Sequence, residues 1–337
     1  MSSLPEQFPE EPESPPGAPA AAPDTDQQTA DRPQIEPNHP FASEIHSPIP
    51  QQDTDTLFKQ YLAFHQPSQE RIPHFGHLII LGLIAVCALV SAGLLANVGI
   101  HFHLYGVTNL QQAGNEIHYT LGTEGLLYIL TFGASLLVFP ALWHESFFAG
   151  IQWRGRAALR RSGYLIAAAA ACFVLAMISG SLMPGPADAP IDKVFRAPGA
   201  AWILFAFGVT FAPFFEELAF RGFLLPALST AFDWIAEKTH DQHPHPLGID
   251  GHPQWSMPAM IVAAILTSIL FALMHADQTG YSLGPFLLLI CVSLVLCWAR
   301  LSSRSLAASV IVHATYNFLL FSFMFFGTGG FKHLENM

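Results

Sequence analysis

Seven apolar stretches, each close to 20 residues long, constrain this chain more than any other feature. They cover residues 77–98, 124–143, 163–183, 200–225, 258–276, 282–299 and 305–326. A helix needs about 20 apolar residues to cross the hydrocarbon of a bilayer. The chain is also 51% hydrophobic and only 12% charged, which is unusual for a soluble protein. We therefore expect an all-α fold, a polytopic transmembrane helical bundle of about seven spans.

Residues 1–73 differ in character from the rest of the chain. They hold 12 acids, 3 bases and 14 of the 26 prolines, and they show no apolar periodicity before about Leu57. Such a segment cannot bury enough apolar surface to offset the entropy lost on ordering. We predict a disordered, acidic, proline-rich tail. Within it, residues 56–64 are compatible either with a short amphipathic helix on the membrane surface or with a folded stub.

The orientation of the bundle is predicted by two basic loops that share one side if all seven stretches cross. Their residues are Arg154, Arg156, Arg160 and Arg161 between the second and third stretches, and Arg300 and Arg304 between the sixth and seventh. Lys and Arg are enriched in cytoplasmic loops. We therefore expect an integral protein of a bacterial plasma membrane, with a cytoplasmic N-terminus and an external C-terminus.

Polar residues are few in the last four stretches, and they form three groups. The groups are Glu216, Glu217 and Arg221; then Phe271 and His275; then His313 and Asn317. A charge near the bilayer centre costs roughly 2.5–3.5 kcal/mol, so these residues need a reason to be there. Helix residues four apart share a face, which allows Glu217 and Arg221 to neutralise each other. Glu216 is left without a local counterion.

Each group also has an interpretation as ordinary packing. Glu217 and Arg221 fit a structural ion pair, a histidine inside a membrane is often hydrogen-bonded packing, and asparagine commonly joins helices. The coincidence of an unpaired Glu216 with two histidines and an asparagine on other helices favours a functional site.

The pattern Glu-Glu-x-x-x-Arg, Phe-x-x-x-His, His-x-x-x-Asn, in this order on successive membrane helices, resembles the CPBP family. This family comprises the CAAX proteases and bacteriocin-processing enzymes, also called the Abi family, and its members are intramembrane endopeptidases. The resemblance covers roughly residues 200–320. It implies a protease core over residues 161–330, preceded by N-terminal transmembrane helices over residues 74–160.

The resemblance also implies a role for each matching residue. Glu216 would be the general base on the attacking water, and His275 would help to hold that water. His313 and Asn317 would stabilise the oxyanion. The supporting residues would be Glu217, Arg221 and Phe271.

A cofactor is not required by this interpretation, although a metal is an alternative. Glu216, His275 and His313 could bind Zn²⁺ with water as the fourth ligand, while the compact His-Glu-x-x-His zinc motif is absent. We favour the metal-free mechanism. The histidine-rich loop with His240, His243, His245 and His252 contains prolines and glycines, so we interpret it as a solvated loop.

Two other classes of function compete with a protease. One is a non-enzymatic membrane protein of the same fold, with a role in bacteriocin self-immunity or scaffolding. The other is a proton-coupled transporter, since intramembrane Glu and His also relay protons. For the protease we expect a peptide or membrane-protein substrate, the lipid bilayer as surroundings, and no nucleic acid. In a bacterium, a peptide precursor is a better substrate than a prenylated CAAX protein.

The depth of the polar residues and the packing of the third span give two further expectations. Straight spans of the predicted lengths place Glu216 in the inner half of the membrane and His275 near the outer end of its helix, so their depths disagree.

In the third span, the alanine run and Gly180 are the small residues that allow helices to pack closely in lipid.

Overall fold

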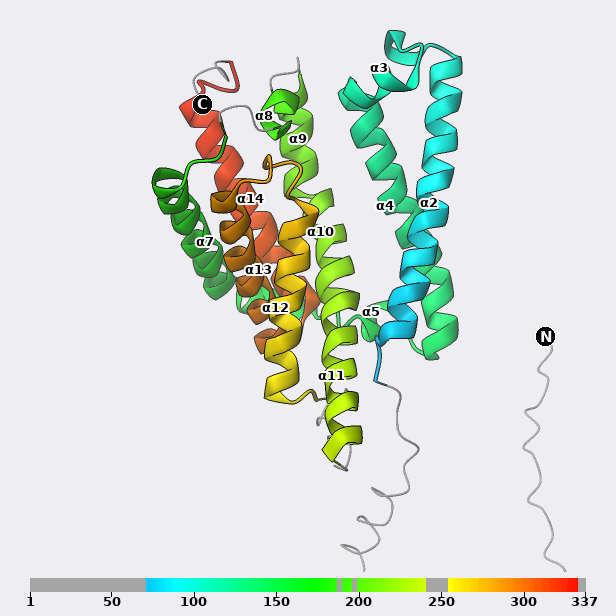
Figure 1. The fold of residues 1–337 in the computed structure, drawn as a ribbon, viewed down its shortest axis with the longest axis vertical. Coiled ribbons are helices and arrows are strands. Elements are labelled where there is room, and N and C mark those ends of the chain that lie inside the picture. Colours follow the sequence, from blue (N-terminus) through cyan, green and yellow to red (C-terminus); the bar gives the residue numbers. More distant parts are fainter. Residues whose placement is uncertain (1–70, 187–189, 196–198, 241–253, 333–337) are drawn as a thin grey trace, which may run out of the picture. The chain divides into compact units, whose positions relative to one another are not determined.

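The computed structural model describes residues 71–186, 190–195, 199–240 and 254–332, which all lie in the second of the chain's two units, residues 69–337. Residues 1–70, including the segment 56–64, lie outside the described residues, as does the histidine-rich loop after His240. The described residues form helices and no strand, so the all-α prediction is confirmed (Figure 1).

The helices follow one another with short connections. The first half contains α2 (Phe75–His101), η1 (Leu104–Gly106), α3 (Leu110–Asn115), α4 (Ile117–Trp143), α5 (Phe147–Gly150), α6 (Gly155–Arg160), α7 (Ser162–Leu182) and α8 (Pro190–Phe195). The second half contains α9 (Ala200–Val209), α10 (Phe211–Glu217), η2 (Leu218–Leu224), α11 (Leu225–His240), α12 (Met257–Met274), α13 (Leu283–Ser303) and α14 (Leu306–Gly327).

Seven helical segments are long and apolar enough to cross a membrane, as predicted: α2, α4, α7, the run α9–α11, α12, α13 and α14. Large apolar side chains point outward along them. Ile79, Leu83 and Val90 on α2, for example, are each more than half exposed. Apolar surface of this extent marks contact with a partner or a membrane, and the chain is an integral membrane protein.

The fourth span is longer than predicted. It continues from Ala200 to Thr239, a run of 40 residues, whereas the sequence predicted an end at residue 225. At 1.5 Å per residue this run is about 60 Å long, roughly twice the hydrocarbon thickness. Part of it therefore extends beyond the hydrocarbon.

This long run is irregular near its middle. Thr210 has φ −114° and ψ −68° and separates α9 from α10, and Pro213 follows three residues later. Proline has no N–H and clashes with the preceding turn, which explains the break. Directly after Glu217, the chain forms a seven-residue π-helix, η2. Such π segments are rare and occur frequently at functional sites.

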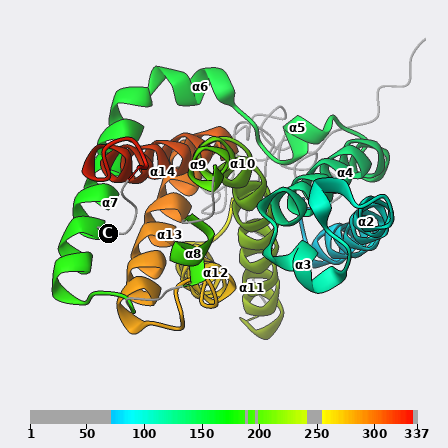
Figure 2. The same cartoon turned by 90° about the horizontal axis from the view of Figure 1, so that it is seen from above.

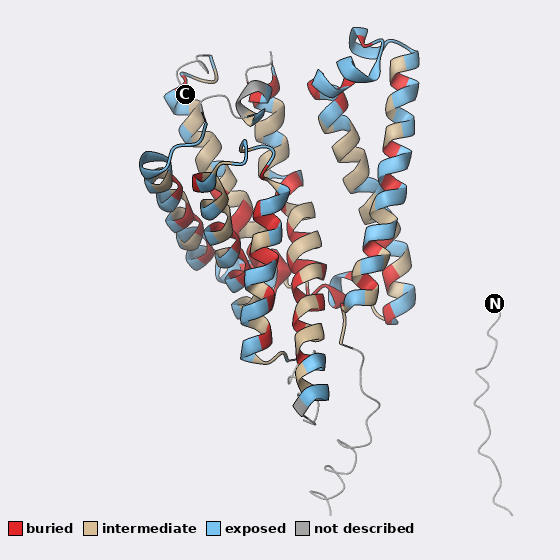
Figure 3. Ribbon diagram, viewed as in Figure 1, coloured by how far each residue is buried: buried red, intermediate tan, exposed pale blue. Residues whose placement is uncertain are grey.

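Figure 2 shows α9–α14 gathered together, with α7 on one side and the α2–α4 pair on the other. Buried residues lie on the faces that these helices turn toward one another (Figure 3). Small buried residues of α7, namely Ala169, Cys172 and Ala176, pack with residues of α13 and α14. A methyl group added to Gly180 would have nothing within 4 Å, so the prediction that this glycine mediates close packing is wrong.

The two basic loops lie at the same end of the bundle. Leu306 N donates to Gln152 O at 3.1 Å, and Arg154 N donates to Ser305 Oγ at 3.2 Å. The first loop therefore packs against the α13–α14 turn. Arg300, however, does not belong to that turn, because α13 continues to Ser303 and the Arg300 side chain is buried. The cytoplasmic location of this end stays a prediction.

Candidate functional site

Three of the predicted residues come together at Glu216, near the end of α10. Glu216 Oε2 lies 3.8 Å from His275 Nε2 and 3.8 Å from His313 Nε2. The three side chains are 13%, 16% and 7% exposed, respectively. Glu216 Oε2 itself is buried and has no hydrogen-bond partner among the described residues. These atoms are too far apart for direct hydrogen bonds, and close enough for one small molecule to contact all three.

The second ring nitrogen of each histidine is held by the protein. His275 Nδ1 lies 2.9 Å from Phe271 O, and His313 Nδ1 lies 2.9 Å from Glu217 Oε1. A carbonyl and an ionised carboxylate only accept hydrogen bonds, so both Nδ1 atoms act as donors. The Nε2 atom of each imidazole therefore faces Glu216, and it is a lone-pair acceptor whenever the ring is neutral.

Glu217 and Arg221 form a buried ion pair beside this group. Arg221 Nη1 lies 2.8 Å from Glu217 Oε1, and both side chains are fully buried. Arg221 Nη2 also donates to the carbonyl and the hydroxyl of Ser293 on α13. The pair thus connects the long fourth span to α13 and, through His313, to α14.

Phe271 packs in the middle of the charged group. Its ring centroid lies 4.7 Å from Arg221 Cζ, 4.5 Å from the His275 ring and 5.9 Å from the His313 ring. An arginine over an aromatic face is attracted by the ring quadrupole. Phe271 thereby separates the ion pair from His275 and fixes the positions of three polar side chains.

Asn317, the fourth predicted catalytic residue, makes its hydrogen bond to another helix. Asn317 Nδ2 donates to Gly208 O at 2.8 Å, next to the break at Thr210. A carboxamide has two N–H groups, so this bond uses one of them. Gly208 allows the approach, because a methyl group in its place would lie 2.9 Å from the Phe321 ring on α14.

The sequence predicted different membrane depths for Glu216 and His275. This disagreement disappears because the fourth span is long. Glu216 lies near the middle of the run from Ala200 to Thr239, and α12 reaches His275 directly after its last residue, Met274. Since α11 continues well past the length first predicted, α12 can begin far along it. Its end is then level with Glu216.

Sequence reasoning missed two residues near the site, Glu124 and Tyr128 of α4. Tyr128 donates to Glu124 Oε1 at 2.7 Å, and the Tyr128 ring stacks on Phe215 with centroids 4.7 Å apart. Glu124 interacts electrostatically with Glu216 and His275. The signal was present, since Glu124 is the only Asp or Glu between Ile117 and Trp143, but the predicted second span began at this residue.

The same atoms are spaced slightly more widely than the ligands of one zinc ion. No group of three or more His, Cys, Asp or Glu side chains among the described residues is arranged to hold a metal. The two distances of 3.8 Å from Glu216 exceed what two ligands about 2.0–2.2 Å from one zinc ion and tetrahedrally arranged would show. Glu216, His275 and His313 are the residues that would hold zinc in the alternative mechanism.

The family model described as type II CAAX prenyl endopeptidase Rce1-like matches residues 198–319. This segment, the Rce1-like domain, is similar to that family over residues 198–319. This agrees with the resemblance to CAAX proteases found in the motifs, and all seven motif residues lie inside the matched segment. No curated protein and no solved structure matches the chain.

The Rce1-like domain runs from the start of α9 into α14. The family that it resembles is one of proteases, and the matched residues include Glu216 with both of its neighbouring histidines. Glu124 and Tyr128 lie outside the matched residues. The Rce1-like domain therefore contacts α4, a helix that lies outside the family match.

Proposed function

We propose that this protein is an intramembrane endopeptidase that hydrolyses a peptide bond by means of a water activated by Glu216. The observation that carries the proposal is the position of Glu216 Oε2, buried and 3.8 Å from the Nε2 atoms of His275 and His313. A buried carboxylate oxygen is normally hydrogen-bonded. A water between these three atoms would supply the donor.

Counting protons assigns different tasks to the two histidines. A water has two hydrogens, while three acceptor atoms face it when both imidazoles are neutral. One histidine must then carry a second proton and donate to the water oxygen. In the proposed mechanism His313 carries it, because the oxyanion needs a donor at Nε2 and Nδ1 of His313 already donates to Glu217 Oε1. His275, bonded to a neutral carbonyl, accepts from the water.

In the reaction, the water oxygen attacks the carbonyl carbon of the substrate and Glu216 takes one of its protons. The carbonyl oxygen becomes an oxyanion, which His313 and the second N–H of Asn317 stabilise. The C–N bond then breaks, and the proton held by Glu216 passes to the leaving nitrogen. Donors aimed at a developing oxyanion are typically worth about 2.7–4 kcal/mol each.

The substrate that we propose is a peptide or the tail of a membrane protein, cleaved near the membrane. Glu216 and His313 lie within segments able to cross a bilayer, and His275 directly follows one, which favours a substrate that is itself held at the membrane. Glu217, Arg221 and Phe271 touch neither water nor substrate in this mechanism. They position His313 and His275.

The proposal is tested with purified protein in lipid nanodiscs, a library of lipid-anchored and free peptides, and mass spectrometry of the products. Glu216→Gln should lower cleavage by about 10²–10⁴-fold, the usual contribution of a general base, without lowering Tm. Glu116→Gln is the matched control, because Glu116 lies outside the candidate spans and should retain full activity. A chelator arm tests metal dependence directly.

Equal cleavage by the Glu216→Gln variant and the parent would remove Glu216 as the base. Absence of cleavage by the parent across the whole library would favour the non-enzymatic alternative, a self-immunity or scaffolding protein with the same fold. Loss of activity with chelator, restored by Zn²⁺, would replace the metal-free mechanism.

A further inference from the structure

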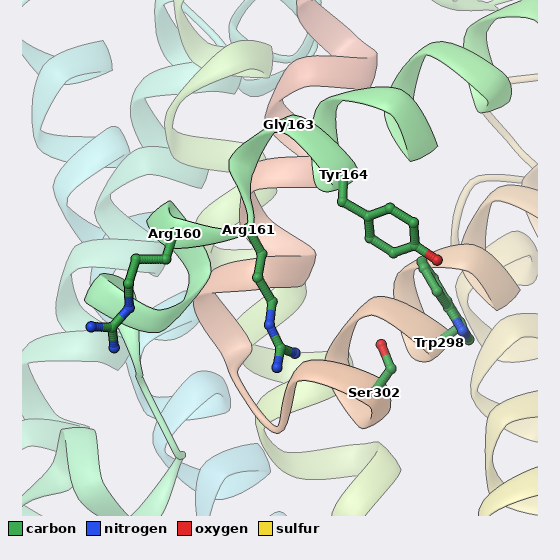
Figure 4. A pocket seen from close by; sticks show the side chains of 6 residues that line it. All are labelled: Arg160, Arg161, Gly163, Tyr164, Trp298 and Ser302. Carbon is green, nitrogen blue, oxygen red and sulfur yellow. The ribbon is translucent and has the colours of Figure 1, made fainter.

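A second polar site lies away from Glu216, at the ends of α7 and α13. It is a cavity of about 510 Å³ lined by Arg160, Arg161, Gly163, Tyr164, Trp298 and Ser302. This volume is in the range of small-molecule sites. In Figure 4 the Arg161 side chain extends between Arg160 and Ser302. The Tyr164 and Trp298 rings lie to the right of Arg161.

The cavity is positively charged. Two of its six lining residues are arginines and none is acidic. Neither Arg160 nor Arg161 forms an ion pair with an acid in the described part of the chain. In addition, α7 is 21 residues long and no side chain caps its N-terminus at Arg161. The N-terminus of a helix carries partial positive charge, which adds to the charge of the two arginines.

The position of the cavity indicates what kind of anion it meets. Ser162 is the first residue of one candidate span and Ser303 is the last of another, so the cavity lies where the spans leave the hydrocarbon. Tyr164 and Trp298, whose ring centroids are 5.4 Å apart, are residue types enriched at the membrane–water interface. Both rings are exposed. The cavity is thus at the level of lipid headgroups, with an aromatic wall and a basic wall.

We infer that this cavity binds the phosphate group of an anionic phospholipid. The arginines would contact the phosphate, Ser302 offers a hydroxyl donor, and the two rings would pack on the glycerol and the first acyl carbons. A zwitterionic headgroup carries an additional cation close to the phosphate, which the two arginines repel. The site therefore selects net negative lipids.

Native mass spectrometry of the detergent-purified protein tests the inference, with phosphatidylglycerol and phosphatidylcholine as the lipids. The parent should retain phosphatidylglycerol in preference to phosphatidylcholine. Since a basic residue near an anionic surface contributes about fivefold in affinity, the R160Q/R161Q variant should bind phosphatidylglycerol roughly 25-fold more weakly. Arg156→Gln makes the same kind of change in the same loop without lining the cavity, and it should bind like the parent.

Three results would overturn the inference: equal affinity for the two lipids, unchanged binding by R160Q/R161Q, or an equal loss in Arg156→Gln. Inorganic phosphate at millimolar concentration distinguishes the source of the phosphate, because displacement of the lipid by it would indicate a free phosphate ligand instead. The R160K/R161K variant keeps both charges, so its retained binding would show that a loss in R160Q/R161Q is electrostatic and not caused by misfolding.

Discussion

His313 Nδ1 lies 2.9 Å from Glu217 Oε1, the same carboxylate oxygen that Arg221 Nη1 reaches at 2.8 Å. The ion pair within the fourth span thus also sets the orientation of a histidine on α14. Through this contact, the ion pair fixes which nitrogen of His313 faces Glu216. In the proposed mechanism the two glutamates, adjacent in sequence, have different tasks: Glu216 faces the reacting atoms, and Glu217 orients a neighbour.

Breaking this ion pair should destabilise the protein. Arg221→Met leaves Glu217 charged and fully buried without its counterion, and removing one partner of a buried pair typically costs about 3–5 kcal/mol. We expect a clearly lower Tm in detergent for Arg221→Met, and again for Glu217→Gln. The double variant should lose less than the sum of the two, as interacting residues do. Full additivity would show that the pair does not act as a unit.

Enlarging Gly208 should lower activity more than stability. A methyl group there would meet the Phe321 ring at 2.9 Å and push α9 away from α14, so that Asn317 loses the carbonyl that holds it. We expect Gly208→Ala to reduce kcat severalfold in the peptide assay. Adding Phe321→Leu should restore it. Gly180→Ala, which meets no atom within 4 Å, is the control, and an equal effect of both glycine substitutions would contradict the argument.

Glu124 should influence which substrates are cleaved. Its carboxylate accepts from Tyr128, whose ring stacks on Phe215 directly before Glu216, so it adds negative potential near the proposed substrate site. Coulomb attraction in such surroundings is much stronger than in water. We expect Glu124→Gln to lower kcat/KM severalfold for peptides with Lys or Arg beside the cleaved bond, with little change for neutral peptides. Uniform loss across the library would instead assign Glu124 a role in packing α4 against the Rce1-like domain.

Arg300 should be needed for stability although the sequence placed it in a loop. Arg300 Nη1 donates to Gln152 Oε1 at 2.9 Å, and Arg300 Nε donates to the carbonyl of Arg221 in η2 at 3.3 Å. Arg300→Met would leave two buried acceptors unsatisfied, each costing about 1–3 kcal/mol. Thermal unfolding measures this effect, and exposed Arg156→Met should unfold like the parent. Equal Tm values would mean that water replaces the lost donors.

Much of the fold and of the candidate site could be predicted because the relevant information is local. About 20 consecutive apolar residues make a span, and residues four apart share a helix face. This sufficed to separate the Glu217–Arg221 pair from Glu216 and to place His313 and Asn317 together. The likeness of these motifs to the CAAX proteases led to the same family as the match over residues 198–319.

Relations between helices were decided by the tertiary structure alone. The length of the fourth span, the partner of Asn317 and the approach of Glu124 to Glu216 all depend on how far one helix is shifted along another. Helices that are apolar on every side carry no periodic signal for that shift. It is set by close contacts such as Gly208 against Phe321 and by buried polar bonds such as Arg221 to Ser293, which join residues far apart in the chain.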